Sequence, residues 1–76
     1  MNQVILPPLG EGIEKATVAF WHVKVGDKVG QEDDIVELVT DKATFNVPAG
    51  SGGILKQILV NEGQDARIGE PLATIE

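Results

Sequence analysis

Hydrophobic and polar residues alternate along this chain in short runs, which Gly, Pro and Asp residues interrupt. β-branched and aromatic residues gather in these runs, as they do in strands. No window keeps the hydrophobic period of a helix for the ten or so residues that a helix needs. Turn signals at intervals of about 8 to 12 residues indicate a small sandwich or barrel. The expected strands cover residues 3–6, 15–23, 28–29, 35–40, 43–47, 54–60, 66–68 and 72–76.

The sequence repeats itself at an offset of 37 residues. The matched pairs are Trp21 with Ile58, Val23 with Val60, Gly26 with Gly63, Val29 with Ala66, Ile35 with Leu72, Val36 with Ala73 and Leu38 with Ile75. Two halves of four short strands each predict two similar sheets related by a pseudo-two-fold axis. Each sheet would leave one apolar face in water, so the sheets are expected to pack face to face.

This pattern predicts an all-β fold, a flattened barrel-sandwich of two four-stranded, mainly antiparallel sheets. The turn at Asp41 and Lys42 joins the two halves, and its symmetry equivalent is the pair of chain ends. Met1 and Glu76 are therefore expected near the end opposite Lys42. The expected core consists of Val4, Leu6, Ile35, Val36, Leu38, Val47, Ile58, Val60, Leu72, Ala73 and Ile75, with Trp21 partly buried.

Composition narrows the classes of function. The 76 residues are expected to form one domain, residues 1–76, near the lower size limit for unaided folding. The net charge of −6 argues against nucleic acid or an anionic membrane as a partner, since both attract clustered Lys and Arg. No apolar run approaches the roughly 18 residues of a membrane span. We therefore expect a soluble, cytoplasmic domain that is monomeric in isolation and binds neither nucleic acid nor membrane.

Side chains suited to catalysis are scarce. The chain has one His, His22, one Ser, Ser51, and neither Cys nor Tyr. His22 follows Trp21 in an apolar run, where a structural or surface role is expected rather than that of a general base. No acidic or His residues have the spacing of metal ligands. We expect a domain that is not an enzyme by itself and that holds no metal.

The stretch VTDKATF, residues 39–45, places two charged residues between two runs of strand character. This arrangement predicts a tight reversal with the side chains of Asp41 and Lys42 at its tip. A lysine at a turn projects into solvent, where other proteins can reach it. Taken alone, the pattern is also that of an ordinary solvated turn.

A wider series of segments changes that interpretation. LPPLGEG, VKVGDKV, ELVTDKAT, GGILKQILVNEG and GEPLATIE follow one another along essentially the whole chain. The series resembles the lipoyl domain of 2-oxo acid dehydrogenase complexes, within the biotinyl/lipoyl-attachment family. Its most specific part is the triplet from Asp41 to Ala43, with Gly26 sixteen residues before Lys42 and Gly53 eleven residues after it.

The resemblance implies a carrier domain of a dihydrolipoamide acyltransferase, with pyruvate dehydrogenase as the expected complex. It implies lipoate attached covalently to Lys42, with Asp41 and Ala43 as recognition flanks. The loop from Pro7 to Glu14 is then expected to dock partners. The docking residues would be Leu9, Gly10, Glu11 and Gly12.

The implied partners are a thiamine-diphosphate-dependent 2-oxo acid dehydrogenase, the acyltransferase core and dihydrolipoamide dehydrogenase. An ammonium group does not react unaided with a free acid, so a lipoate ligase or a lipoyl transferase is also implied. The catalytic steps would belong to these partners, and the domain would carry acyl groups and electrons between them.

Alternative functions are a biotinyl carrier and an unmodified barrel-sandwich interaction module. Biotinyl carriers flank their lysine with methionine, whereas the one methionine here is Met1. The carrier of the glycine-cleavage system has a longer chain with additional helical segments. The hybrid domains of membrane-fusion proteins are interrupted by a long helical hairpin, which the continuous stretch ELVTDKATF does not contain.

Overall fold

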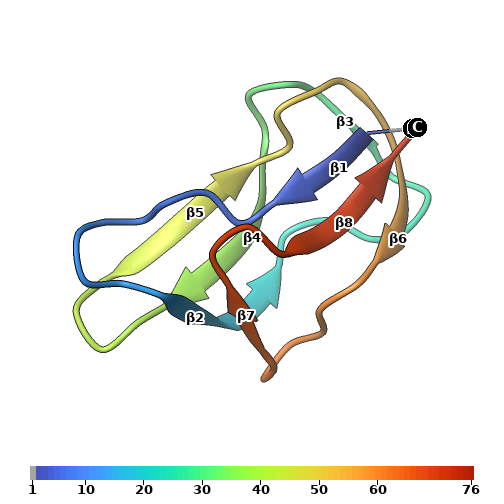
Figure 1. Ribbon diagram of the computed structural model, residues 1–76. Helices are drawn as coiled ribbons and strands as arrows, with labels where there is room; N and C mark the ends of the chain where they lie inside the picture. The colour runs from blue at the N-terminus through green and yellow to red at the C-terminus, as the bar shows by residue number, and fades with distance from the viewer. Residues whose placement is uncertain (1) are drawn as a thin grey trace.

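The computed structural model describes residues 2–76 and consists of strands and turns in two layers (Figure 1). The strands are β1 (Asn2–Ile5), β2 (Lys15–Trp21), β3 (Lys28–Val29), β4 (Asp34–Val39), β5 (Thr44–Pro48), β6 (Gly53–Ile58), β7 (Asp65–Arg67) and β8 (Pro71–Ile75). They form two four-stranded antiparallel sheets, ordered β1-β8-β6-β3 and β5-β4-β2-β7. The predicted fold class is confirmed, and each strand lies within two residues of its predicted bounds. Residues 2–76 include no helix long and apolar enough to cross a membrane.

The pseudo-two-fold relation predicted from the repeat is visible in the order of the strands. If β1, β2, β3 and β4 are exchanged with β5, β6, β7 and β8 respectively, the strand order of one sheet becomes that of the other. The two halves are interleaved, because each sheet takes two strands from each half. Neither half can therefore form its sheet without strands from the other.

The same symmetry holds for individual pairings. Leu38 lies opposite Phe45 between β4 and β5, and Ile75 lies opposite Asn2 between β8 and β1. The turns also correspond. The Asp27 carboxylate accepts the Lys24 amide at 2.8 Å, and 37 positions later the Gln64 side chain accepts the Asn61 amide at 2.9 Å. Repeated sequence thus produces repeated local hydrogen bonding.

The hydrophobic core lies between the two sheets. Nine expected members are buried: Val4, Leu6, Ile35, Val36, Leu38, Val47, Leu72, Ala73 and Ile75. Six further buried hydrophobic residues were not predicted: Ala16, Val18, Val29, Ala49, Leu55 and Ala66. Trp21 is partly buried as expected, and its indole N–H donates to the Val60 carbonyl at 2.9 Å.

The prediction that Ile58 and Val60 are core residues was wrong. Both are only partly buried and pack against the margin of the core. A register shift between Leu55 and Gln57 breaks the alternation of β6 against β8, so Leu55 takes the fully buried position. Val60 lies beyond the end of β6, in the loop that follows.

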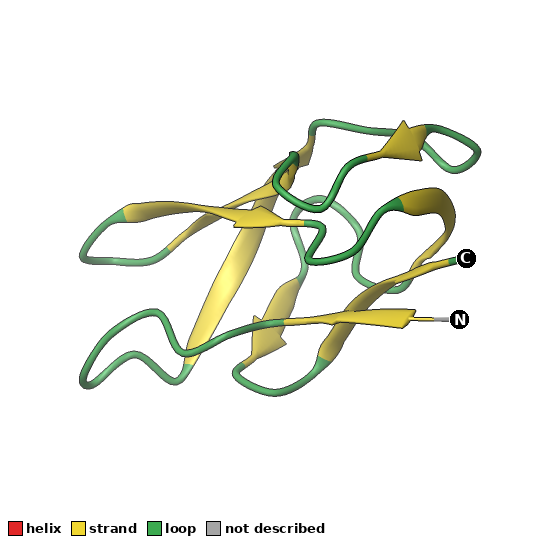
Figure 2. Ribbon diagram, turned by 90° about the horizontal axis from the view of Figure 1, so that it is seen from above, coloured by secondary structure: helices red, strands yellow, loops and turns green. Residues whose placement is uncertain are grey.

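The molecule is elongated, with principal dimensions of 32 × 20 × 17 Å. The β1–β2 loop and the β4–β5 turn lie together at one end, and the C-terminus lies toward the other (Figures 1 and 2). Glu76 is therefore distant from Lys42, as predicted. Met1 lies outside the described residues, so its expected position stays a prediction.

Candidate functional site

The β4–β5 turn consists of residues 40–43 and is closed by hydrogen bonds at its base. Val39 and Thr44 are the last paired residues of the two strands. Beyond them, the Thr40 amide donates to the Ala43 carbonyl at 2.8 Å. This short connection leaves Asp41 and Lys42 at the tip, where the sequence placed them.

Thr40 makes the side-chain contacts that organise this tip. Its hydroxyl oxygen accepts the amide of Lys42 at 3.1 Å and the amide of Ala43 at 3.0 Å. The hydroxyl also lies 3.1 Å from the Ala43 carbonyl, to which it can donate. Thr40 was not among the residues predicted from the sequence, although hydroxyl residues at the start of turns form such backbone bonds.

Lys42 and its flanks Asp41 and Ala43 are all exposed. Within residues 2–76, the ammonium of Lys42 forms neither an ion pair nor a hydrogen bond. Two lysines that lie on strands differ in this respect. Lys15 pairs with Asp65 and Lys56 pairs with Glu76, in each case at 3.7 Å.

The β1–β2 loop passes beside the side chain of Lys42. A Cβ atom added at Gly12 would lie 3.3 Å from the Lys42 ammonium nitrogen, and Gly12 has a φ of +82° that disfavours other residues. The loop and the lysine are thus close neighbours in the structure. Gly10 and Glu11 are exposed, like Gly12, whereas Leu9 packs against the core and anchors the loop.

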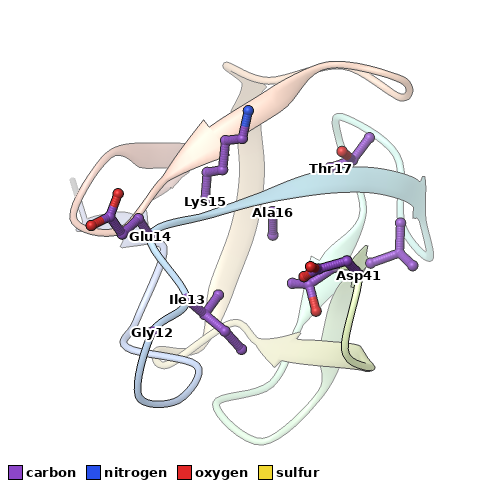
Figure 3. Close-up of a pocket in the computed structure, with 9 residues that line it drawn as sticks. Gly12, Ile13, Glu14, Lys15, Ala16, Thr17 and Asp41 are labelled. Atoms are coloured by element: carbon purple, nitrogen blue, oxygen red, sulfur yellow. The ribbon is translucent and has the colours of Figure 1, made fainter.

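A hollow of about 440 Å³ separates the loop from the turn (Figure 3). It is lined by Gly12, Ile13, Glu14, Lys15, Ala16, Thr17, Val39, Thr40 and Asp41. Ile13 and Asp41 come from the two facing segments, while the charged end of Glu14 points away from Asp41 (Figure 3). The charged side chains of the lining, Glu14, Lys15 and Asp41, are exposed to solvent.

The other polar candidates have surface positions. The Nε2 atom of His22 lies 3.0 Å from the Asn46 side-chain oxygen, and its ring packs edge-to-face with Phe20 at 4.6 Å between centroids. The Asp33 carboxylate accepts the Gly30 amide at 2.8 Å within a turn. Among the described residues, no group of three or more His, Cys, Asp or Glu side chains could hold a metal ion.

Comparisons with known proteins identify relatives of the chain. A family model described as "Biotin-requiring enzyme" matches residues 2–75. The lipoamide acyltransferase component of the branched-chain alpha-keto acid dehydrogenase complex of Bacillus subtilis is 37% identical over all of this chain. The dihydrolipoyllysine-residue acetyltransferase component of the pyruvate dehydrogenase complex of Staphylococcus epidermidis is 32% identical over 93% of the chain. The chain spans only 18% and 16% of these two relatives.

A solved domain matches over nearly its whole length. The lipoyl domain of the 2-oxoglutarate dehydrogenase complex from Azotobacter vinelandii superimposes with a TM-score of 0.75 at 36% identity. The match covers 99% of this chain and 96% of that domain. The likeness therefore extends over the turn, the loop beside it and both sheets.

Proposed function

Because the chain belongs to the family of biotin- and lipoyl-attachment domains, we propose that it is a lipoyl carrier domain with lipoate joined through an amide to Lys42. The observation that carries this proposal is the position of Lys42, which is exposed at the tip of the turn between the halves and has no ionic partner within residues 2–76. The proposed carrier is the whole of residues 1–76, with Asp41 and Ala43 as recognition flanks.

The residues around Lys42 suit such a group. An exposed ammonium without an ionic partner among the described residues loses little when it becomes a neutral amide. Its formal charge disappears, and the net charge of the chain changes from −6 to −7. When bound, lipoate supplies two sulfur atoms that can carry an acyl group or a pair of electrons. The chain has no cysteine of its own to do so.

The rest of the chain would hold and present this arm while partner enzymes perform the chemistry. The proposed partners are a thiamine-diphosphate-dependent 2-oxo acid dehydrogenase, an acyltransferase core, dihydrolipoamide dehydrogenase and a lipoate ligase or lipoyl transferase. Linking the carrier to such an assembly would give the arm a high effective concentration at each active site. This advantage explains why a protein domain would carry a small cofactor.

Within this class we propose pyruvate dehydrogenase as the complex. The related proteins belong to branched-chain alpha-keto acid dehydrogenase, 2-oxoglutarate dehydrogenase and pyruvate dehydrogenase complexes. The lipoylated domain should therefore be offered to the three dehydrogenases, each with its own 2-oxo acid. Fastest reductive acylation by the pyruvate dehydrogenase with pyruvate would support the proposal. A clear preference for one of the other two dehydrogenases would contradict it and assign the domain to that complex.

The β1–β2 loop is the proposed docking element for the dehydrogenase, through Leu9, Gly10, Glu11 and Gly12. Support comes from the position of the loop beside Lys42 and from the exposure of Gly10, Glu11 and Gly12. In this proposal Leu9 anchors the loop and Glu11 offers the charged contact. Glu11→Gln should slow reductive acylation without slowing lipoylation, and equal rates would exclude Glu11 from docking.

Lys42→Arg tests the attachment site. The domain is produced with lipoate and a lipoate ligase, and its intact mass is measured before peptide mapping. Wild type should gain one lipoyl group at residue 42, whereas Lys42→Arg should gain none because a guanidinium group stays protonated. The variant should still fold, since a change at an exposed turn typically alters stability by no more than about 0.5 kcal/mol.

Lys56→Arg is the matched control, because it makes the same change at an exposed lysine on β6. It should accept lipoate like wild type. Lipoylation that persists in Lys42→Arg, or spreads over several lysines, would contradict the assignment. The same experiment with biotin and a biotin ligase tests the biotinyl alternative, for which the mass gain would be that of biotin.

A further inference from the structure

We propose that Thr40 is a positioning residue that presents the Lys42 amine to the lipoylating enzyme. The inference rests on the proposed function of Lys42. It arises from the hydroxyl of Thr40, which is within 3.1 Å of the Lys42 amide, the Ala43 amide and the Ala43 carbonyl. One side chain thus holds the backbone on both sides of the Lys42 side chain.

Little else restrains the tip. The side chains of Asp41, Lys42 and Ala43 are exposed. Among the described residues, the amides of Lys42 and Ala43 find their hydrogen-bond acceptor in the Thr40 hydroxyl. Thr40 itself is half-buried, and a β-branched side chain has few rotamers available. The Thr40 hydroxyl is therefore a hydrogen-bond acceptor in a fixed position beneath the tip of the β4–β5 turn, which has few other restraints.

Loss of the hydroxyl would leave the fold in place. The pairing of Val39 with Thr44 and the hydrogen bond from the Thr40 amide to the Ala43 carbonyl belong to the backbone. At an exposed tip, water can replace the missing acceptor, so the net loss for each hydrogen bond is small. Loss of the hydroxyl would instead broaden the distribution of backbone conformations at Lys42.

That distribution matters for group transfer. The ligase must bring the amine nitrogen to within about 3–3.5 Å of the activated acyl carbon in the correct direction. A tip that is ordered beforehand avoids the entropy cost of ordering it in the complex. We expect removal of the hydroxyl to lower kcat/KM for lipoylation about tenfold, the effect of a modest loss of preorganisation.

The test compares Thr40→Val, which replaces the hydroxyl with a methyl group, with Thr40→Ser, which keeps it. Initial rates are measured with a purified lipoate ligase, ATP and lipoate over a range of concentrations of the unmodified domain. Thr40→Val should show the loss in kcat/KM, and Thr40→Ser should restore a rate near that of wild type. Amide hydrogen exchange at Lys42 and Ala43 should accelerate in Thr40→Val but not in Thr40→Ser.

Thr44→Val is the matched control. It removes the hydroxyl of an exposed threonine at the first position of β5 and should change neither the lipoylation rate nor the exchange at the tip. Thr40→Ala provides a second variant without the hydroxyl if Thr40→Val does not fold. Melting curves establish that each variant is folded before its rate is compared.

The outcomes separate this inference from the proposed function. If wild type gains no lipoyl group at Lys42, the proposed function fails. The role of Thr40 is overturned if wild type is modified at Lys42 and the folded Thr40→Val variant is lipoylated equally fast. Thr40→Ala takes the place of Thr40→Val in this comparison if Thr40→Val does not fold. An equal loss of rate in Thr40→Val and Thr40→Ser would also overturn that role, because the hydroxyl would not be the cause.

Discussion

At the scale of single residues, Gly53 shows how closely the backbone segments approach one another. A Cβ atom added to Gly53 would lie 2.6 Å from the carbonyl oxygen of Glu76 and 2.9 Å from a methyl carbon of Ile75. The sequence marked Gly53 by its spacing from Lys42, yet its contacts are at the C-terminal strand. Its requirement for glycine is therefore explained by packing between β6 and β8.

Gly53→Ala should destabilise the domain by about 1–3 kcal/mol, the usual cost of forcing extra atoms into a packed site. Gly52→Ala is the control, because its nearest neighbour is the Val29 carbonyl oxygen at 3.7 Å, an ordinary contact distance. Urea unfolding followed by Trp21 fluorescence measures both variants. Equal midpoints for the two would show that β6 moves away at little cost.

The residues of the candidate site were predictable to different degrees. Asp41, Lys42 and Ala43 lie at the tip because charged residues between two strand-like runs favour a reversal. Thr40 was missed because its importance lies in where its hydroxyl points, which depends on the path of the turn. The hollow is lined by two separate segments, residues 12–17 and residues 39–41. A contact between segments so far apart in the chain has no local signal in the sequence.

At the scale of elements, β4 is central to the fold. It pairs with β2 on one side and β5 on the other, and its Leu38 is fully buried. Leu38→Ala should destabilise the domain by about 2–5 kcal/mol, the usual range for a buried leucine. Val39→Ala, one residue along the strand and exposed, should cost far less. Thermal melting measures both, and similar melting temperatures would contradict this division of the strand into faces.

Strands were predicted well here because alternation and turn residues are local properties. The register shifts in strand pairing were not predicted. The register shift after Leu55 places Ile58 at the margin of the core, and a similar shift between Val18 and Phe20 leaves Phe20 exposed. A register shift depends on the partner strand, which lies far away in the sequence, so a count of alternating positions does not reveal it.

At the scale of the whole molecule, the pseudo-two-fold axis relates the β4–β5 turn to the gap between the chain ends. The pairings on the two sides have the same register, Leu38 with Phe45 and Ile75 with Asn2. A circular permutant can therefore join Glu76 to Met1 through a second Thr-Asp-Lys-Ala turn. New ends would be opened at the exposed Gly52, in the β5–β6 loop.

This permutant should fold, and it should accept two lipoyl groups where wild type accepts one. With Lys42→Arg in the same chain it should still accept one, because the new turn has equivalent strands beneath it. Intact mass after lipoylation gives the count, and circular dichroism establishes the fold. A folded permutant that accepts one group at Lys42 alone would show that the β1–β2 loop beside Lys42 is also required.

The β4–β5 turn, which carries Lys42, and the C-terminus lie toward opposite ends of the molecule (Figure 1), and this arrangement has a mechanical consequence. If the domain is held by its C-terminus, the folded strands act as a rigid spacer, and the longest dimension of the domain is 32 Å. A flexible Gly-rich chain would need about 30 residues to reach the same root-mean-square distance. That chain would also spread its end over a large volume, whereas the folded strands keep the whole extension in one direction.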